Sequence, residues 1–222
     1  MKIGIFGGSF DPIHNGHVNL AKYVLDHTDL DEVWLMVSPR NPLKDHGPIA
    51  TDQQRLKMAR LAVEGISGIR VSDFEFHLPI PSYTYKTLTE LKKTYPKNDF
   101  RLIIGGDNWA DFNRWRNPQE ILTEFGLIVY PRPSDSLQSS SPDSRHATRV
   151  THHAFNSSLL TLDSLKKNVV FLQDAPQMPI SSTEIRTLLS NPNSHKASRP
   201  MQILSILPQS VISYIHSHHL YS

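Results

Sequence analysis

The sequence predicts an α/β protein built around a parallel sheet. A short apolar run at 2–6, KIGIF, ends at two glycines, and apolar residues recur at helical spacing at 17–27. A second apolar run follows at 32–38. The order strand, glycine turn, helix, strand is a βαβ unit, whose two strands run parallel. We therefore expect a doubly wound sheet with helices on both faces.

The rest of the chain continues this alternation. Thr51 or Asp52 begins a capped helix that ends at Gly65, and FRLIIGG at 100–106 is the strongest strand pattern of the chain. The remaining patterns predict strands at 69–76, 125–133 and 169–176, helices at 83–95 and 118–123, and a helical segment from about 181. Together these elements predict a Rossmann-like parallel sheet with a small helical C-terminal part.

A Ser-rich segment at about 134–168 interrupts the pattern. It is poor in large apolar residues at first and rich in turn formers, and only 159–167 has a helical pattern. We interpret the segment as a surface insertion, because long connections of this kind lie on protein surfaces. The chain has no internal repeat, so residues 1–222 are expected to form one domain with this decorated loop.

The composition argues against several classes of protein. Lys and Arg number 23 against 21 acidic residues, a net charge of +2, which is too balanced for a nucleic-acid-binding surface. The chain has no cysteine, which excludes disulfides, thiolate nucleophiles and Cys-ligated zinc. Its apolar runs fall short of the roughly 18 residues of a membrane span, and the first one breaks at Gly7. We expect a cytoplasmic protein, and the sequence leaves monomer or homo-oligomer open.

The turn after the first predicted strand, GGSFDPIHNGH at 7–17, carries the strongest chemical pattern. A glycine pair lets backbone N–H groups approach an anion, and the start of the next helix adds a positive dipole. His14 and His17 are three residues apart, which places both rings at the helix entrance. Such a pair alone is typical of surface or capping histidines, and zinc would need a third ligand. The carboxyl end of a parallel strand, however, is where ligands bind.

This turn resembles the signature G-x-F-D-P-x-H-x-G-H of the nucleotidylyltransferase superfamily, and ISSTEIR at 180–186 resembles a second signature, I-S-S-T-x-I-R. Two signatures in the correct order are more specific than either alone. Three further segments are similar to the bacterial nicotinate-nucleotide adenylyltransferase family: SYTYKTL at 82–88, GGDNWADFNRW at 105–115 and LPQSVISYIHSHHLY at 207–221. The likeness runs from Lys2 to Tyr221, apart from the Ser-rich segment.

The resemblance implies transfer of AMP from ATP to nicotinate mononucleotide, which gives nicotinate adenine dinucleotide and pyrophosphate. Mg²⁺ would enter on the ATP phosphates, so no metal-ligating residue is expected. The attacking phosphate oxygen is already ionised. The protein therefore needs positioning and charge stabilisation rather than a nucleophile of its own, which suits a chain without cysteine.

The resemblance also assigns residues to ATP. The expected ATP-binding residues are Gly7, Gly8, Ser9, Phe10, His14, His17, Ser181, Ser182, Thr183 and Arg186. His14, His17, Arg186 and Lys44 are expected to act on the phosphates during catalysis. Lys44 lies in N-P-L-K, where the family often has P-P-H-K. For the hydroxyls at 181–183, helix capping alone is the alternative role. Asp11 is expected to shape the turn at 7–17 rather than to contact substrate.

The acceptor nucleotide is expected at Thr84, Asp107, Trp115 and Arg132. Asp107 follows a central strand and is suited either to bind a ribose hydroxyl or to cap the next helix. Aromatic residues at three-residue spacing near 109–115 are typical of a core, and the family motif F-x-x-W makes Trp115 the candidate that stacks on the pyridine ring. Arg132 lies in YPRP, where the family usually has R-P-G.

The sequence leaves two other hypotheses about the function open. Another member of the superfamily would use nicotinamide mononucleotide or phosphopantetheine as the acceptor. A nucleotide-binding sensor would keep the fold without turnover, although the histidine pair and Arg186 argue against it. The histidines at 216–219 fit a solvated helix end.

Overall fold

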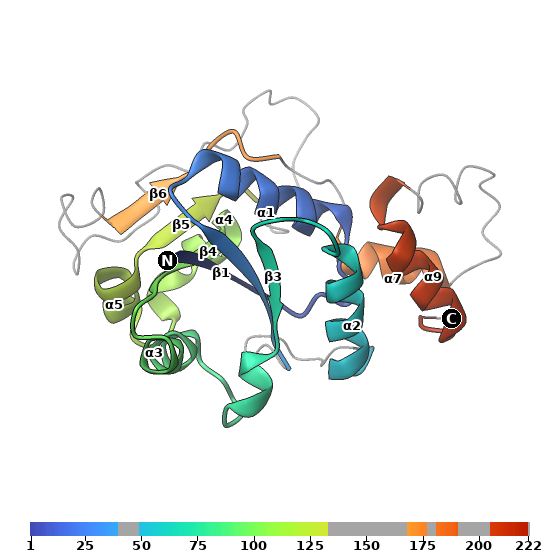
Figure 1. The fold of residues 1–222 in the computed structure, drawn as a ribbon, viewed down its shortest axis with the longest axis horizontal. Helices are drawn as coiled ribbons and strands as arrows, with labels where there is room; N and C mark the ends of the chain where they lie inside the picture. The colour runs from blue at the N-terminus through green and yellow to red at the C-terminus, as the bar shows by residue number, and fades with distance from the viewer. Residues whose placement is uncertain (40–48, 133–167, 177–180, 191–204, 222) are drawn as a thin grey trace.

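Six parallel strands form the centre of the molecule (Figure 1). The computed structural model of the chain describes residues 1–39, 49–132, 168–176, 181–190 and 205–221. The order across the sheet is β3-β2-β1-β4-β5-β6, and all neighbouring strands are parallel. The strands are β1 (Lys2–Gly8), β2 (Glu32–Val37), β3 (Ile69–Ser72), β4 (Asp99–Gly105), β5 (Leu127–Tyr130) and β6 (Val169–Phe171). The predicted Rossmann-like sheet is confirmed.

Helices alternate with the strands as the sequence predicts. The described helices are α1 (Asn15–His27), α2 (Asp52–Ala62), α3 (Thr84–Thr94), α4 (Gly106–Ala110), α5 (Pro118–Glu120), α7 (Ser182–Ser190) and α9 (Gln209–Ser217). Short helical turns follow at η1 (Phe74–His77), η2 (Phe112–Arg114) and η3 (Ile121–Phe125). Thr51 caps α2, and its hydroxyl accepts the Gln54 N–H at 3.3 Å. The insertion predicted at 134–168 lies outside the described residues except for Asn168.

Three strands are shorter than predicted. The expected strand at 69–76 ends at Ser72, whose hydroxyl accepts the N–H of Phe74, and the chain continues as η1. A serine side chain that bonds nearby backbone in this way competes with the sheet ladder. The strand predicted at 169–176 ends at Phe171 and gives way to a turn, while the strand predicted at 125–133 spans only β5.

Apolar side chains of the strands alternate between two cores, one on each face of the sheet. In β2, Val33, Leu35 and Val37 belong to the core that contains the buried residues of α1 and α2, while Trp34 and Met36 belong to the core of α3. Helix α9 joins the first core and packs against α2 (Figure 1). Helices therefore cover both faces, as a doubly wound fold requires.

The strand order reverses between β1 and β4. The chain leaves β1 to build β2 and β3 on one side, and β4 then pairs with the other side of β1. In open parallel sheets, ligands bind outside the carboxyl ends of the strands at this switch point. Here the two ends are Gly8 of β1 and Gly105 of β4, so the loops that follow them are expected to form the site.

No helix in the described parts of the chain is both long enough and apolar enough to cross a membrane.

The turn that joins η3 to β5 gives a test of the fold. Gly126 has φ 77° and ψ 171°, and an added Cβ would lie 3.0 Å from the backbone oxygen of Asn168. This backbone region is essentially restricted to glycine. We predict that Gly126→Ala lowers the free energy of unfolding by about 2–4 kcal/mol.

Gly65→Ala is the matched control, because Gly65 has φ 76° but no atom within 4 Å of the added Cβ. It should cost about 1 kcal/mol, from backbone strain alone. Urea denaturation at neutral pH measures both variants. Equal losses of unfolding free energy in the two variants would show that the contact with Asn168 does not constrain the turn before β5.

Candidate active site

The loop after β1 is anchored by a buried phenylalanine. Phe10 has φ 47° and is 2% exposed, and its ring makes edge contacts with Phe6 and His17 at centroid distances of 5.9 and 5.0 Å. A Cβ at Gly8 would lie 2.9 Å from the Phe10 ring, so the turn needs glycine there. The ring beneath the loop therefore fixes the backbone path of the predicted phosphate-binding residues.

His14 and His17 lie against each other at the start of α1. Their ring centroids are 3.7 Å apart, and the backbone N–H of His14 donates to Nδ1 of His17 at 3.2 Å. A neutral imidazole that accepts at Nδ1 carries its proton on Nε2, which fixes the tautomer of His17. The two rings predicted to act together are therefore one packed unit at the end of β1.

His14 is held in its neutral form. It is 6% exposed, and burial together with the positive charge of Arg132 lowers its pKa to about 4. Its Nδ1 is buried and has no hydrogen-bond partner among the described residues. Buried polar atoms are rarely left unpaired. The His14 side chain also faces the backbone N–H of His17 in a capping-box arrangement at the start of α1.

The second predicted motif forms the first turn of α7. The Ser181 hydroxyl accepts the N–H of Glu184 at 3.2 Å, and the Glu184 carboxylate accepts the N–H of Ser181, which is a capping box. The hydroxyl of Ser182 donates to the carbonyl of Pro12 at 3.0 Å, and that of Thr183 accepts from Arg186. All three hydroxyls thus have partners within the protein, and the capping alternative holds for Ser181.

The two motifs meet through Arg186. Its Nη1 donates to the backbone carbonyl of Asp11 at 2.7 Å and lies 3.8 Å from the Asp11 carboxylate. These residues are 175 positions apart in the sequence. Together with the contact between Ser182 and Pro12, this bond places the start of α7 directly against the loop after β1.

Asp11 shapes the turn, as predicted. Its carboxylate is 3% exposed and accepts the N–H of Ile49 at 2.8 Å, the N–H of Ala50 at 3.1 Å and the hydroxyl of Tyr221 at 2.6 Å. Burial and the neighbouring Asp11 carboxylate raise the pKa of Tyr221, so its hydroxyl stays protonated and donates. The contribution of Tyr221 was not predicted from the sequence.

Arg55 is a second residue that the sequence did not identify. Its side chain is fully buried in α2 and donates to the carbonyls of Ser9 and Ser38, and it pairs with Asp52. The guanidinium thereby joins the loops that follow β1 and β2. One signal was present in the sequence, because Arg55 occupies a core-facing position of an amphipathic helix, directly before Leu56.

The predicted acceptor residues lie after other strands of the same edge. Asp107 is in α4, directly after β4, and pairs with Arg132 at 3.7 Å, while its Oδ1 is buried without a hydrogen-bond partner in the described chain. A Cβ at Gly105 would collide with this same oxygen, so a larger residue there would displace the Asp107 side chain. Thr84 begins α3 and is half-buried.

The two tryptophans have different environments. Trp109 is 2% exposed and packs on Phe112 in the core, as predicted. Trp115 is half-buried, and its Nε1 is enclosed without a hydrogen-bond partner among the described residues. An indole of this kind has a face for stacking and a donor for a ligand. Lys44, the remaining predicted residue, lies outside the described residues.

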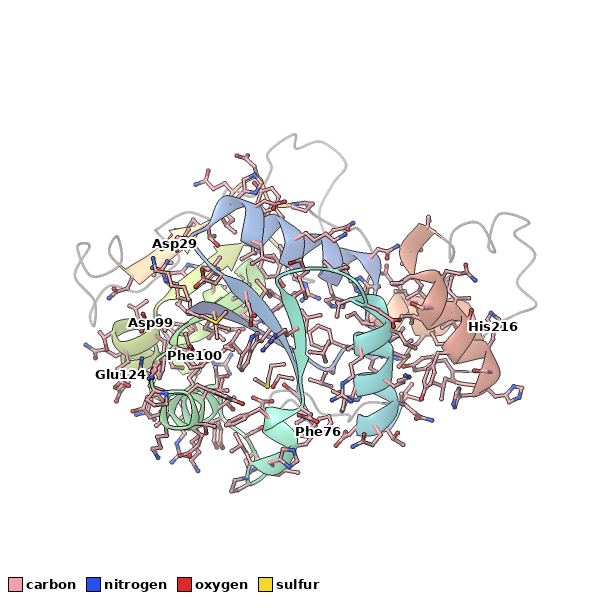
Figure 2. All side chains as sticks on the ribbon, viewed as in Figure 1. Asp29, Phe76, Asp99, Phe100, Glu124 and His216 are labelled. Atoms are coloured by element: carbon pink, nitrogen blue, oxygen red, sulfur yellow. The ribbon has the colours of Figure 1, made fainter. Side chains whose placement is uncertain are left out.

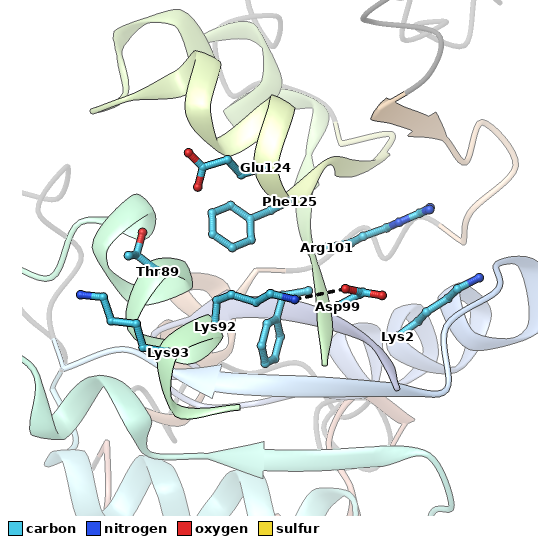
Figure 3. A pocket seen from close by; sticks show the side chains of 9 residues that line it. Lys2, Thr89, Lys92, Lys93, Asp99, Arg101, Glu124 and Phe125 are labelled. Atoms are coloured by element: carbon cyan, nitrogen blue, oxygen red, sulfur yellow. Dashed lines mark hydrogen bonds and ion pairs between the residues drawn. The ribbon is translucent and has the colours of Figure 1, made fainter. Parts of the chain in front are cut away.

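The opposite edge of the sheet carries a basic pocket (Figure 3). It lies at the amino ends of β1 and β4 and includes Lys92, Arg101 and Lys2. Lys92 pairs with Asp99 at 3.2 Å, and Lys2 pairs with Asp29 at 2.6 Å. Because these cations already have carboxylate partners, the pocket is poorly suited to a polyphosphate. The carboxyl edge remains the candidate site.

The fold and the residues at the carboxyl ends of its strands define a protein that binds a nucleotide at the switch point of a parallel sheet. A model of the family described as cytidylyltransferase-like matches residues 5–188. A Bacteroides fragilis protein named probable nicotinate-nucleotide adenylyltransferase is 45% identical over 189 residues, which cover 85% of this chain and 82% of that protein. A Flavobacterium johnsoniae protein of the same name is 39% identical over 221 residues, 100% of this chain and 99% of the relative. The chain therefore belongs to the cytidylyltransferase-like family and, within it, to the nicotinate-nucleotide adenylyltransferases.

Solved structures support the fold assignment. The nicotinic acid mononucleotide adenylyltransferase of Plasmodium falciparum, solved in complex with NaAD, has a TM-score of 0.70 at 22% identity. The superposition covers 99% of this chain and 97% of that one. The same enzyme complexed with APC has a TM-score of 0.67, with 99% and 96% coverage.

The lowered pKa of His14 predicts a specific acid sensitivity. The unfolded chain takes up a proton on this imidazole below about pH 6.5, whereas the folded chain does so only near the pKa of about 4. The free energy of unfolding is therefore unaffected by this group above about pH 6.5. It falls by on the order of 3 kcal/mol as the pH drops toward 4, because only the unfolded chain binds the proton there. His14→Asn should lose less stability than the parent over this range.

Urea denaturation between pH 7 and pH 4 measures this effect. His216→Asn is the control, because His216 is exposed on α9 (Figure 2). It should follow the parent at every pH. Identical pH dependence of the parent and His14→Asn would contradict the neutral, buried state of His14.

Proposed function

We propose that this protein transfers AMP from ATP to nicotinate mononucleotide, with the ATP phosphates held between the loop after β1 and the start of α7. The contact between Arg186 and the carbonyl of Asp11 carries the proposal, because it joins the second motif to the loop that leads into the two histidines. Close relatives with the matching name support the choice of reaction.

The reaction needs no nucleophile from the protein. An ionised phosphate oxygen of nicotinate mononucleotide attacks the α-phosphorus of ATP, and the bond from that phosphorus to the bridging oxygen breaks. Nicotinate adenine dinucleotide and pyrophosphate form, and no proton has to move before the attack. Negative charge grows on the departing pyrophosphate. Catalysis therefore depends on donors aimed at that charge.

The proposed donors are Nε2–H of His17, the guanidinium of Arg186, the backbone N–H groups of residues 7–10 and the first turn of α7. Arg186 keeps a full positive charge at any working pH. The first N–H groups of a helix have no acceptor within the helix and attract an anion. Lys44 is kept as a further proposed phosphate contact, on the family motif alone.

Nicotinate mononucleotide is proposed to bind across Thr84, Asp107, Trp115 and Arg132. The unpaired Oδ1 of Asp107 is suited to accept a ribose hydroxyl, and the face of Trp115 is suited to the pyridine ring. Arg132 is about half exposed and carries charge that an anionic substrate would meet. Its pairing with Asp107 would hold both groups in place until the substrate arrives.

The divalent cation is proposed to enter as part of the substrate, on the phosphates of ATP. Among the described residues, no group of three or more His, Asp or Glu side chains is arranged to hold a metal ion. The nearby carboxylate of Asp11 already accepts three hydrogen bonds. Mg²⁺ fits this role, because it keeps most of its water and is commonly bound through substrate phosphates.

A substrate panel tests the proposed reaction. Pyrophosphate release is measured with MgATP and, in separate assays, nicotinate mononucleotide, nicotinamide mononucleotide or phosphopantetheine. We expect the highest kcat/KM with nicotinate mononucleotide, since Arg132 favours the extra carboxylate. Release of pyrophosphate with phosphopantetheine and none with nicotinate mononucleotide would overturn the proposal.

His17→Ala tests whether the histidine pair acts in turnover. The loss of one donor to the transition state should lower kcat by about 10²–10³. Affinity for a non-hydrolysable ATP analogue, measured by calorimetry, should change only a few-fold. His27→Ala, at an exposed position of α1, is the control and should leave kcat unchanged. Unchanged turnover in His17→Ala would remove the catalytic role of this residue.

A further inference from the structure

Arg116 differs from the other arginines in the part of the chain that the structure describes. Its guanidinium has no carboxylate partner and no hydrogen bond among the described residues, and its Cζ lies 5.0 Å from the centroid of the Tyr83 ring. The other described arginines each lie 2.5–3.8 Å from an Asp or Glu oxygen: Arg55, Arg60, Arg70, Arg101, Arg114, Arg132 and Arg186. Arg116 is therefore the described arginine whose positive charge no described carboxylate offsets at close range.

The contact with Tyr83 places this charge between two stretches that are proposed to bind the acceptor. Arg116 directly follows Trp115, the candidate that stacks on the pyridine ring, and Tyr83 directly precedes Thr84 at the start of α3. The Arg116 side chain is exposed, so a ligand can reach its guanidinium. A pyridine ring bound against Trp115 and near Thr84 would thus lie within reach of this cation.

The ring of Tyr83 attracts the guanidinium without using its hydrogen-bond donors. A cation within about 6 Å of an aromatic centroid is drawn to the ring face, which offers no oxygen acceptor. The planar fork of N–H groups therefore stays available to a carboxylate, with which arginine forms paired, charge-assisted hydrogen bonds. Nicotinate mononucleotide carries a carboxylate on its pyridine ring, whereas nicotinamide mononucleotide carries a neutral amide there. Only the first gains from a positive charge at this place.

We propose that Arg116 selects nicotinate mononucleotide over nicotinamide mononucleotide by pairing with the carboxylate on the pyridine ring, while Tyr83 supports the guanidinium. This inference rests on the proposed function, since it uses the acceptor site given there. Arg132 adds to the preference for the carboxylate, but its pairing with Asp107 at 3.7 Å offsets part of its charge. The charge of Arg116 has no such partner in the described chain and acts on the carboxylate in full.

Arg116→Gln is the test, because it removes the charge and keeps a polar side chain. Calorimetry measures the Kd of each mononucleotide, with and without a non-hydrolysable ATP analogue. The preference for nicotinate mononucleotide should fall about five- to tenfold, the scale of one partly exposed charge-assisted pair. Affinity for nicotinamide mononucleotide should stay within twofold, whereas a merely structural role would weaken both ligands equally. In turnover, the ratio of the two kcat/KM values should fall by the same factor.

Arg114→Gln is the matched control. Arg114 lies two positions earlier in the same segment, is 83% exposed and already pairs with Asp111. Its replacement removes the same charge from the same surface and should leave both affinities unchanged. A fall in preference equal to that of Arg116→Gln would show that the net charge of the surface, rather than the place of Arg116, selects the ligand, and would overturn the inference.

Two substitutions of Tyr83 test the support of the guanidinium. Tyr83→Phe keeps the ring face and should keep the preference, whereas Tyr83→Leu removes the face and should lower it. In the Arg116→Gln background, Tyr83→Leu should lower the preference no further, because the cation that it supports is gone. An equal fall in both backgrounds would contradict the supporting role of Tyr83.

The outcomes separate this inference from the proposed function. A parent that binds nicotinate mononucleotide preferentially but releases no pyrophosphate rejects the proposed reaction and leaves the inference standing. A parent that turns over but binds the two mononucleotides equally rejects the inference alone. Binding of neither mononucleotide, with or without the analogue, or an unchanged preference in Arg116→Gln, would overturn it as well.

Discussion

The carboxylate of Asp11 is a buried charge on which the candidate site depends. It accepts N–H groups from Ile49 and Ala50 and the hydroxyl of Tyr221, and its own backbone carbonyl accepts Arg186. A buried carboxylate is tolerated only when hydrogen bonds replace its lost water. The need to satisfy this carboxylate therefore draws residues 49–50 and Tyr221 toward the loop after β1, and the carbonyl of the same residue holds Arg186 there.

The sheet decides where these parts meet. Because β4 pairs with the side of β1 opposite β2, the carboxyl ends of β1 and β4 flank one crevice. The buried ring of Phe10 holds the first loop over it, and Arg55 fastens that loop to the end of β2. Beside this loop, His14 stays neutral because burial and the charge of Arg132 lower its pKa, and Arg186 adds a permanent positive charge.

Much of this arrangement could be predicted from the sequence, because its determinants are local. The glycine turn, the histidine pair and the alternation of apolar runs each lie within a few residues, and the structure confirms the parallel sheet that they predict. The early end of β3 was missed because Ser72 diverts a backbone N–H, which periodicity does not reveal. Arg55 and Tyr221 were missed because their partners lie 46 and 210 residues away. Contacts of that span become visible only when the chain is folded.

A crystal structure with a non-hydrolysable ATP analogue and Mg²⁺ tests the central claim most directly, namely that two distant motifs hold one triphosphate. We predict phosphate oxygens within hydrogen-bond distance of both the histidine pair and the guanidinium of Arg186. Phosphates that contact only one of these motifs would contradict the account. Phosphates bound instead in the basic pocket at the amino ends of β1 and β4 would contradict it as well.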